Sequence, residues 1–242
     1  MTDTDLARLR QYDTPTICNV IELFEIRPRN TGYMDGRIRA CFPEFPPVVG
    51  YASTATIRTA FPRQETSSYK SLDEQVRAFQ DLPGPPIVVF QDLDDPPIAA
   101  TFGEIMCATY QAFGAAGLIT SGAARDLDQV RRLHFAAFSN GAICSHGYSH
   151  IPSIHEPVRV GGIAVCPGDL LHGDANGVTT IPLDIASEVA EAADEYVAAE
   201  AVVLDHLKTG SRDVAQFSQA RQECLRRIAG LGKRVRTRRA MA

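Results

Sequence analysis

The chain has 242 residues, of which 45% are hydrophobic and 22% are charged, and its formal net charge at pH 7 is −5. This composition is typical of a globular protein with enough apolar material for one large domain, and no apolar run approaches the roughly 18 residues of a membrane span. The N-terminus carries Asp3, Asp5, Arg8 and Arg10 instead of a basic start followed by an apolar core, so we expect a soluble, cytoplasmic protein.

Helix and strand patterns alternate through the first half of the chain. We place the boundaries of these elements from helix-capping residues, from the spacing of apolar residues and from Pro-Gly segments that end helices and strands. The expected elements are a helix starting at Asp13 or Thr14, a loop from Asn30 to Pro47, a strand from Gly50, a helix from Ser71 or Leu72 to Leu82 and a strand from Ile87 to Gln91.

A strand-helix-strand-helix unit covers the middle of the chain. An acidic loop with Asp92, Asp94 and Asp95 leads to a helix from Gly103 or Glu104 to Phe113, then to the strand LITS and a helix from near Asp126 to Leu133. Such a unit predicts neighbouring parallel strands with a right-handed crossover. Both strand-to-helix loops should therefore open on one edge of the sheet.

The remaining sequence is first rich in glycine and then helical. We expect strands over Val158 to Val165 and Val178 to Ile181, with Gly168, Asp169 and Asp174 in turns. Helices are expected over Leu183 to Leu207 and Ser211 to Ile228. The whole pattern predicts a single α/β domain with helical ends.

Charge is concentrated at the C-terminus. From Arg221 onward there are eight Lys or Arg residues against Glu223 alone, so the rest of the chain carries −5 − 7 = −12. An acidic body argues against a general nucleic-acid surface. We interpret the basic tail from Gly232 as a solvated end or as a segment that packs on an acidic neighbouring subunit, with anion binding as the alternative.

Cysteine and histidine spacing predicts no metal site. The six cysteines lack a CxxC pair, so we expect reduced, mostly buried thiols, with Cys166 in the core. His146, His150 and His155 follow Cys144 without a zinc spacing. We interpret these histidines as loop or interface residues, with a substrate contact or a metal ligand as the alternative.

Arg125 and Asp126 carry the strongest functional signal. They follow the strand LITS and a Ser121-Gly122 turn, where an arginine can hold a carboxylate and an aspartate can hold a hard cation. The acids of the 92–95 loop and Glu104 should share that sheet edge, which suits Mg²⁺ or Mn²⁺. The amides of Ile105 and Met106, at a helix N-terminus, would stabilise an enolate oxygen.

Ordinary helix capping could explain the same residues. Asp126 followed by Gln129 fits a capping box, and Glu104 in a first helical turn is favourable through the helix dipole alone. Arg125 could pair with Asp128 on the surface. Spacing alone leaves these alternatives open.

The sequence resembles the RraA-like family in three motifs. They are G-E-x-M in GEIMCATYQAFG, G-x-x-R-D in GLITSGAARDL, and P-G-D-x-x-x-x-D-x-x-G-V in the run from Pro167. The resemblance implies a layered β/β/α swivelling domain over residues 1–242, with a core over about 9–185, a helical extension over 186–231 and a basic tail over 232–242. It also implies a homotrimer or homohexamer with sites between subunits.

That family includes metal-dependent 4-hydroxy-4-methyl-2-oxoglutarate aldolases and oxaloacetate decarboxylases. The resemblance implies that Arg125 binds the pyruvyl carboxylate, that Asp126 and Glu104 serve the metal, and that the amides of Ile105 and Met106 bind the enolate. Gly103 and Gly122 would lie beside the substrate. Two features depart from the family pattern: Ser121-Gly122 stands where an Asp-Gly pair is usual, and the 144–155 loop is rich in histidine.

We therefore expect a Mg²⁺- or Mn²⁺-dependent lyase that cleaves a C–C bond of a 2-oxo acid. The alternative is a non-catalytic protein-binding regulator, the function for which the family is named. A methyltransferase ranks last, because no strand is followed by a Gly-rich turn suited to a nucleotide methyl donor. We expect no membrane or nucleic-acid partner.

Overall fold

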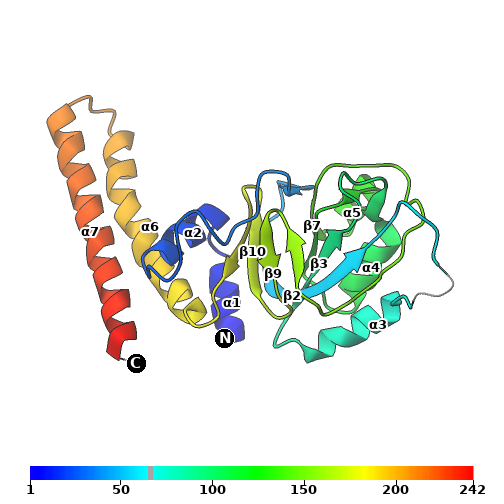
Figure 1. The fold of residues 1–242 in the computed structure, drawn as a ribbon. Helices are drawn as coiled ribbons and strands as arrows, with labels where there is room; N and C mark the ends of the chain where they lie inside the picture. Colours follow the sequence, from blue (N-terminus) through cyan, green and yellow to red (C-terminus); the bar gives the residue numbers. More distant parts are fainter. Residues whose placement is uncertain (65–67, 242) are drawn as a thin grey trace. The chain divides into compact units, whose positions relative to one another are not determined.

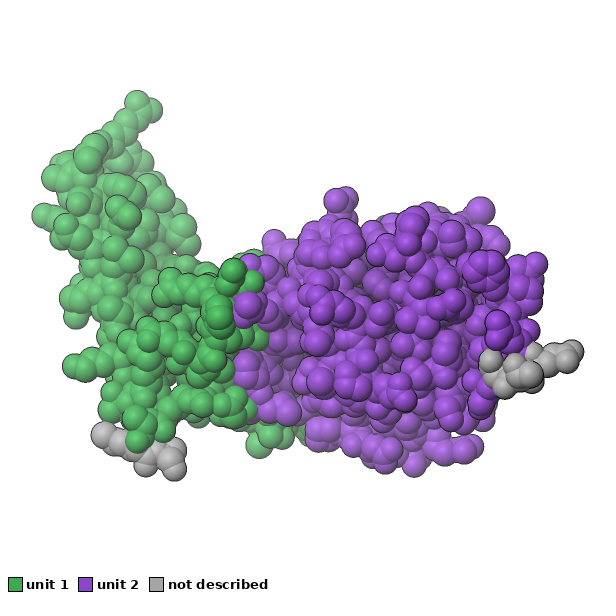
Figure 2. Space-filling view, viewed as in Figure 1, with its two compact units in different colours: residues 1–30, 184–242 green, residues 31–183 purple. Residues whose placement is uncertain are grey.

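The computed structural model describes residues 1–64 and 68–241, and the chain forms two compact units (Figures 1 and 2). Unit 1 combines the two ends of the chain, Met1–Asn30 and Asp184–Ala242. Unit 2 is the continuous segment Thr31–Leu183 and contains every residue expected at the functional site.

Unit 2 is built on a seven-stranded sheet in the order β1-β7-β5-β3-β2-β10-β11. The four central strands run parallel, which confirms the expected crossover unit: β7 (Ala136–Ser139), β5 (Gly117–Thr120), β3 (Pro86–Asp92) and β2 (Val48–Ile57). Antiparallel strands complete the two sides: β1 (Arg39–Ala40), β10 (Leu170–Asp174) and β11 (Gly177–Ile181).

Alternate residues of β3 face two different cores, because successive side chains of a strand point to opposite faces. Val88 and Phe90 pack with the helix layer, whose members are α3 (Leu72–Arg77), the 3₁₀ helix Ala78–Asp81, α4 (Glu104–Ala112) and α5 (Leu127–Arg132). Ile87 and Val89 pack with the hairpin of β8 (Val158–Val160) and β9 (Ile163–Val165). Hairpin, sheet and helices therefore form the expected β/β/α layers (Figure 1).

A separate pair of short parallel strands positions the candidate site. β4 (Ala100–Phe102) pairs with β6 (Ala123–Ala124). β4 leads directly into α4, and β6 leads into α5. The sequence pattern did not predict either strand, because two or three residues are too few to show an alternation.

The glycine-rich region differs from the expectation in two places. Val158 to Val165 is a hairpin instead of one strand, because Gly161 and Gly162 take φ values of +55° and +81° that reverse the chain. Leu170–Asp174 forms the unpredicted strand β10 between β2 and β11. Its residues are all buried, so the segment lacks the alternating polarity by which a strand is recognised.

Asp169 lies in the turn before β10 as expected, Asp174 is the last residue of that strand, and the cysteines are less buried than expected. The Asp169 carboxylate accepts from the Cys166 amide at 2.7 Å, and the Asp174 carboxylate accepts from the Asn176 amide at 2.7 Å. All six cysteines are free, but only Cys107 and Cys224 are buried. Cys166 is exposed, so its placement in the core was wrong: the residue lies on the turn that follows β9.

Unit 1 is helical and contains α1 (Asp3–Leu9), α2 (Thr14–Glu22), α6 (Ala186–Lys208) and α7 (Val214–Met241). The Asp13 side chain caps α2 by accepting from the Thr16 amide at 2.8 Å, as the sequence predicts. Small residues of α6, among them Ala190 and Ala193, are completely buried and allow close helix packing. Within the described residues, no helix is long and apolar enough to cross a membrane.

The basic tail is the end of a helix. We expected the last helix to stop at Ile228 and the residues from Gly232 to be a solvated or intersubunit tail, but α7 continues to Met241. Its arginines pair with acids of the same unit: Arg234 with Glu195, Arg238 with Glu191 at 3.1 Å, and Arg239 with Asp184 at 2.7 Å. Residue 242 lies outside the described residues. The acidic residues that the basic C-terminus packs against thus belong to α6 and to the segment before it, in the same chain.

Replacing Phe90 by alanine tests the helix-side core. Phe90 is completely buried between the sheet and the helices, so Phe90→Ala should lower the free energy of unfolding by about 3–5 kcal/mol. Phe61→Ala removes a side chain of the same size that is 64% exposed and should change stability by less than about 1 kcal/mol. Chemical denaturation measures both, and equal losses would contradict this description of the core.

Candidate active site

The pairing of β4 with β6 brings Gly103-Glu104 and Arg125-Asp126 together. Ala100 lies opposite Ala123 and Phe102 opposite Ala124, so both strands end on the same edge. The Arg125 amide donates to the Phe102 carbonyl at 3.1 Å. The residues that follow the two strands therefore meet although 21 positions separate Glu104 from Arg125.

Asp126 caps the helix that begins with Glu104. Its Oδ2 accepts from the Glu104 amide at 3.1 Å and lies 3.9 Å from Arg125 Nε. Asp126 has left-handed backbone angles (φ +55°, ψ +38°) and its side chain does not cap its own helix α5. The capping-box interpretation with Gln129 was therefore wrong, because the carboxylate is directed to α4 instead.

Arg125 also lacks the surface partner considered above. Asp128, its expected alternative partner, pairs with Arg131 at 3.4 Å. The side chains of Arg125 and Asp126 are each 34% exposed. The pair is therefore held in place by the protein and still open to a ligand.

Gly103 permits this close approach. A Cβ atom on Gly103 would overlap Asp126 Oδ2 and would lie 3.0 Å from Arg125 Nε. An added Cβ atom would force the Asp126 carboxylate to move, so this contact depends on glycine for space and not for an unusual φ. The N-cap of α4 is consequently covered by the two charged side chains.

The first turn of α4 presents its amides at this site. Glu104 is exposed and Ile105 is 81% exposed, whereas Met106 is partly buried against the helix-side core. The amides of a first helical turn have no partner within the helix and carry partial positive charge. Since Glu104 donates to Asp126, the amides of Ile105 and Met106 are the ones placed to bind an anionic oxygen.

Gly122 lies in the turn that leads into β6, the strand before Arg125. It is buried, its amide donates to Thr120 Oγ1 at 2.9 Å, and a Cβ atom would lie 2.5 Å from Asp92 Oδ2. It packs between Asp92 and Thr101, which fixes the turn from β5 into β6. Its expected place beside a substrate stays a prediction.

The acidic loop does not join this site. We expected Asp92, Asp94 and Asp95 to converge with Arg125, but these acids line a different cavity, of about 330 Å³, which neither Glu104 nor Asp126 lines. The Asp94 carboxylate instead accepts from the amides of Thr59 and Ala60 at 2.6 and 3.0 Å. The expected convergence was wrong, because β6 carries Arg125 away from the end of β3.

Two arginines of this second cavity were missed by the sequence analysis. Arg37 comes from the loop before β1 and Arg159 from β8, and both line the cavity beside the three aspartates. Neither belongs to a motif. The only available signal was Asp92 itself, an acid directly at the end of the apolar run IVVFQ.

Burial raises the pKa of Asp92 to about 6. The residue is 6% exposed; its Oδ1 accepts from the Asp94 amide at 3.0 Å, and its Oδ2 has no hydrogen-bond partner. The hydrogen bond from the Asp94 amide lowers the pKa of Asp92, and the negative charge of Asp94 raises it. Loss of hydration on burial is the largest cause of the shift. The ionised form is therefore disfavoured in the folded protein.

The histidines lie apart from one another. His150 is buried, its Nδ1 lies 2.8 Å from the Tyr148 carbonyl oxygen, and its ring meets Tyr69 edge-on. His146 is exposed and His155 lies 3.4 Å from Ser53 Oγ. Within the part of the chain that the structure describes, no three His, Cys, Asp or Glu side chains gather as a metal site.

Asp92→Asn should stabilise the protein at neutral pH. The pKa of Asp92 is raised on folding, so its ionisation costs stability as the pH rises from about 4 through 6. Allowing for screening, we expect a gain of about 1–2 kcal/mol above pH 7 and almost none near pH 4. Thermal unfolding across this range measures the effect. Asp81→Asn, at an exposed position and not among the charges that shift the pKa of Asp92, is the control, and a pH-independent gain in Asp92→Asn would contradict the assignment.

Comparison with known proteins agrees with this architecture. A family model described as "RraA-like: Aldolase/RraA" matches residues 14–180. A protein of Halalkalibacterium halodurans named "Putative 4-hydroxy-4-methyl-2-oxoglutarate aldolase" is 33% identical over 105 residues, which are 43% of this chain and 49% of that protein. The match thus spans about half the length of this curated relative.

Two solved structures share the fold. An uncharacterized protein from Pseudomonas syringae pv. tomato aligns with a TM-score of 0.72 and 22% identity over 92% of this chain and 94% of its own. RraAS2 of Streptomyces coelicolor, described as an unusual member of the RNase ES inhibitor RraA protein family, aligns with a TM-score of 0.66 and 22% identity over 83% of this chain and 95% of its own. At these identities the likeness concerns the fold.

Proposed function

The chain belongs to the RraA-like family, and from this we propose that it is a divalent-metal-dependent lyase that cleaves a C–C bond of a 2-oxo acid. The reaction would be retro-aldol cleavage of a 4-hydroxy-2-oxo acid, decarboxylation of oxaloacetate, or both. Support comes from the relative named as an aldolase and from the grouping of Arg125, Asp126 and the N-terminus of α4.

One observation carries the proposal: Asp126 Oδ2 lies within 3.1 Å of the Glu104 amide and 3.9 Å of Arg125 Nε, over a glycine that leaves no room for a side chain. The arrangement places a cation, a carboxylate and helix amides around one open point. A protein that only needed to cap α4 would not require an arginine there. An anionic substrate with developing negative charge uses all three groups.

Arg125 would bind the α-keto carboxylate through two parallel hydrogen bonds. The amides of Ile105 and Met106 would donate to the keto oxygen as it gains charge when the C–C bond breaks. These donors are fixed by the backbone of α4, so they need no reorganisation during the reaction. Glu104 would accept the proton of the substrate hydroxyl, directly or through water, because it is the exposed acid at this edge.

The donor set fits Mg²⁺ or Mn²⁺ that keeps most of its water. Asp126 and Glu104 are the available carboxylates, and Asp126 retains Oδ1 after Oδ2 is used by the Glu104 amide. Mg²⁺ is commonly held by one or two carboxylates with water and substrate oxygens, so a larger protein cluster is not needed. When bound, the cation would supply Lewis-acid polarisation of the substrate.

We further propose that the protein works as a homotrimer or homohexamer. The exposure of Ile105 beside the site, at 81%, suits a surface that a second subunit covers. Such a subunit could complete the pocket and exclude water.

Asp126→Ala should abolish the proposed activity. The measurement is pyruvate release from oxaloacetate or a 4-hydroxy-2-oxo diacid with Mg²⁺ present, and we expect a loss of at least about 100-fold in kcat/KM. Asp128→Ala is the matched control, because Asp128 lies two residues away with a side chain 80% exposed. An inactive wild-type protein across these acids and several metals would refute the proposal.

Gly103→Ala should reduce activity without unfolding the protein. The added methyl group overlaps Asp126 Oδ2, so the carboxylate must leave the Glu104 amide. A displacement of about 1 Å at a catalytic group can cost about 100-fold in rate. Gly230→Ala is the control, since a Cβ atom there meets nothing within 4 Å. Full activity of Gly103→Ala would show that this position of Asp126 is not used.

The second candidate is a protein-binding regulator without catalysis. The observation in its favour is the set of exposed apolar side chains on the hairpin of α6 and α7, among them Leu204, Leu207 and Val214 at 55%, 53% and 77% exposure. Calorimetry with Mg²⁺ and pyruvate separates the two. Binding of both favours the lyase, and binding of neither favours the regulator.

A further inference from the structure

The cavity beside Asp92 is a second polar site in unit 2. It lies at the carboxyl ends of three parallel strands, where Asp92 ends β3, Ser121 follows β5 and Asn140 follows β7. Its volume of about 330 Å³ is in the range of small-ligand pockets. The carboxyl edge of a parallel sheet is the usual place for such pockets in α/β proteins.

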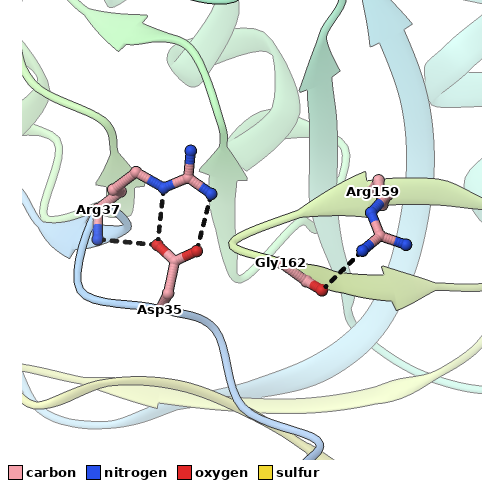
Figure 3. A network of polar contacts seen from close by, with 4 residues as sticks. All are labelled: Asp35, Arg37, Arg159 and Gly162. Atoms are coloured by element: carbon pink, nitrogen blue, oxygen red, sulfur yellow. Dashed lines mark hydrogen bonds and ion pairs between the residues drawn. The ribbon is translucent and has the colours of Figure 1, made fainter.

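Two arginines line this cavity, and Figure 3 shows the hydrogen bonds that each guanidinium makes. Arg37 is held by Asp35 through Nε at 3.0 Å and Nη2 at 2.8 Å. The Arg159 guanidinium makes one hydrogen bond, from Nη2 to the Gly162 carbonyl at 3.3 Å, and no ion pair of Arg159 is found among residues 1–64 and 68–241. Arg159 therefore keeps free donors for an anion.

The rim is held firmly. A Cβ atom on Gly161 would lie 2.5 Å from Met34 Cβ and 2.8 Å from Ile38 Cγ1, and Gly161 accepts from the Asp35 amide at 2.8 Å. The Arg159 amide donates to Gln91 Oε1 at 2.8 Å, which ties β8 to β3. The guanidinium of Arg159 thus extends from a backbone that does not need to be ordered by the ligand.

The lining of the cavity also contains a buried carboxyl group with incomplete hydrogen bonding. Asp92 is 6% exposed and its Oδ2 has no hydrogen-bond partner in the structure. Leaving such a group unpaired costs about 1–3 kcal/mol. Because Asp92 Oδ2 is itself buried, the acid of this lining that a ligand donor can reach is the exposed Asp95.

We propose that this cavity binds a small carboxylic acid that also carries a hydroxyl or ammonium group, with the carboxylate at Arg159 and the hydrogen-bond donor toward the aspartates of the lining, of which Asp95 is the exposed one. The guanidinium selects the planar anion. The ligand must also carry a hydrogen-bond donor, because the aspartates of the lining would repel a second anionic group. The ligand binds without any change of covalent bonds.

This second site does not depend on the proposed lyase reaction. Gly103, Glu104, Arg125 and Asp126 do not line the cavity. Gly122 separates the two regions, since it packs on Asp92 and is followed by the strand that leads to Arg125. The two sites can therefore be tested one without the other.

Calorimetry of the full chain in EDTA, with lactate, alanine and propionate as probes, tests the proposal. The three acids match in size and differ in carrying a hydroxyl group, an ammonium group or neither. We expect lactate or alanine to bind at least ten-fold more tightly than propionate, and Arg159→Gln to weaken that binding at least ten-fold. Arg125→Gln removes the guanidinium of the other site and so distinguishes binding there from binding in this cavity. Arg212→Gln, at an exposed position, is the control and should leave the binding unchanged.

The outcomes are distinct. Tighter lactate binding identifies a hydroxy acid as the ligand class, and tighter alanine binding identifies an amino acid. Equal binding of all three acids, no binding, or loss in Arg125→Gln without loss in Arg159→Gln would overturn the proposal. Because EDTA removes divalent metal, failure of the lyase reaction would leave this result unaffected.

Discussion

The parallel pairing of β4 with β6 is the constraint on which the candidate site depends. Two strands of three and two residues bring the start of α4 against the start of α5, and the absent side chain at Gly103 lets the Asp126 carboxylate reach the Glu104 amide. The same contact places Arg125 over the helix N-terminus. The helix N-terminus, the carboxylate and the guanidinium therefore lie together.

A second consequence of the sheet is that polar groups separate into two regions. Gly122 packs against Asp92 and Thr101, so the chain turns tightly after β5 and leaves the 92–95 loop on another cavity. The first region joins Asp126 to an arginine and helix amides. The second joins buried Asp92 to Arg37 and Arg159. The buried carboxyl and the partly exposed pair therefore meet different environments, and burial raises the pKa of Asp92.

In unit 1, the acidic residues of α6 pair with the arginines of α7. α6 is rich in alanine and glutamate, α7 ends in arginines, and the two helices pair these charges while Leu231 and Val235 are buried. Exposed ion pairs contribute about 0–1 kcal/mol each, so the apolar contacts stabilise the hairpin more than the charges do. The charges instead select which faces of the two helices meet.

The sequence by itself determined the alternation of helices and strands, the parallel centre of the sheet, the cap at Asp13, the helix start near Ser71, and the motif that contains Arg125 and Asp126. These features depend on local spacing, on capping chemistry and on motifs of a few residues. Tertiary structure decided which acids share a site, since Asp92 and Asp126 lie at the ends of different strands. It also decided the buried strand β10, the exposure of Cys166 and the partners of the C-terminal arginines. Those properties arise from contacts between segments far apart in the chain, for which local sequence carries no signal.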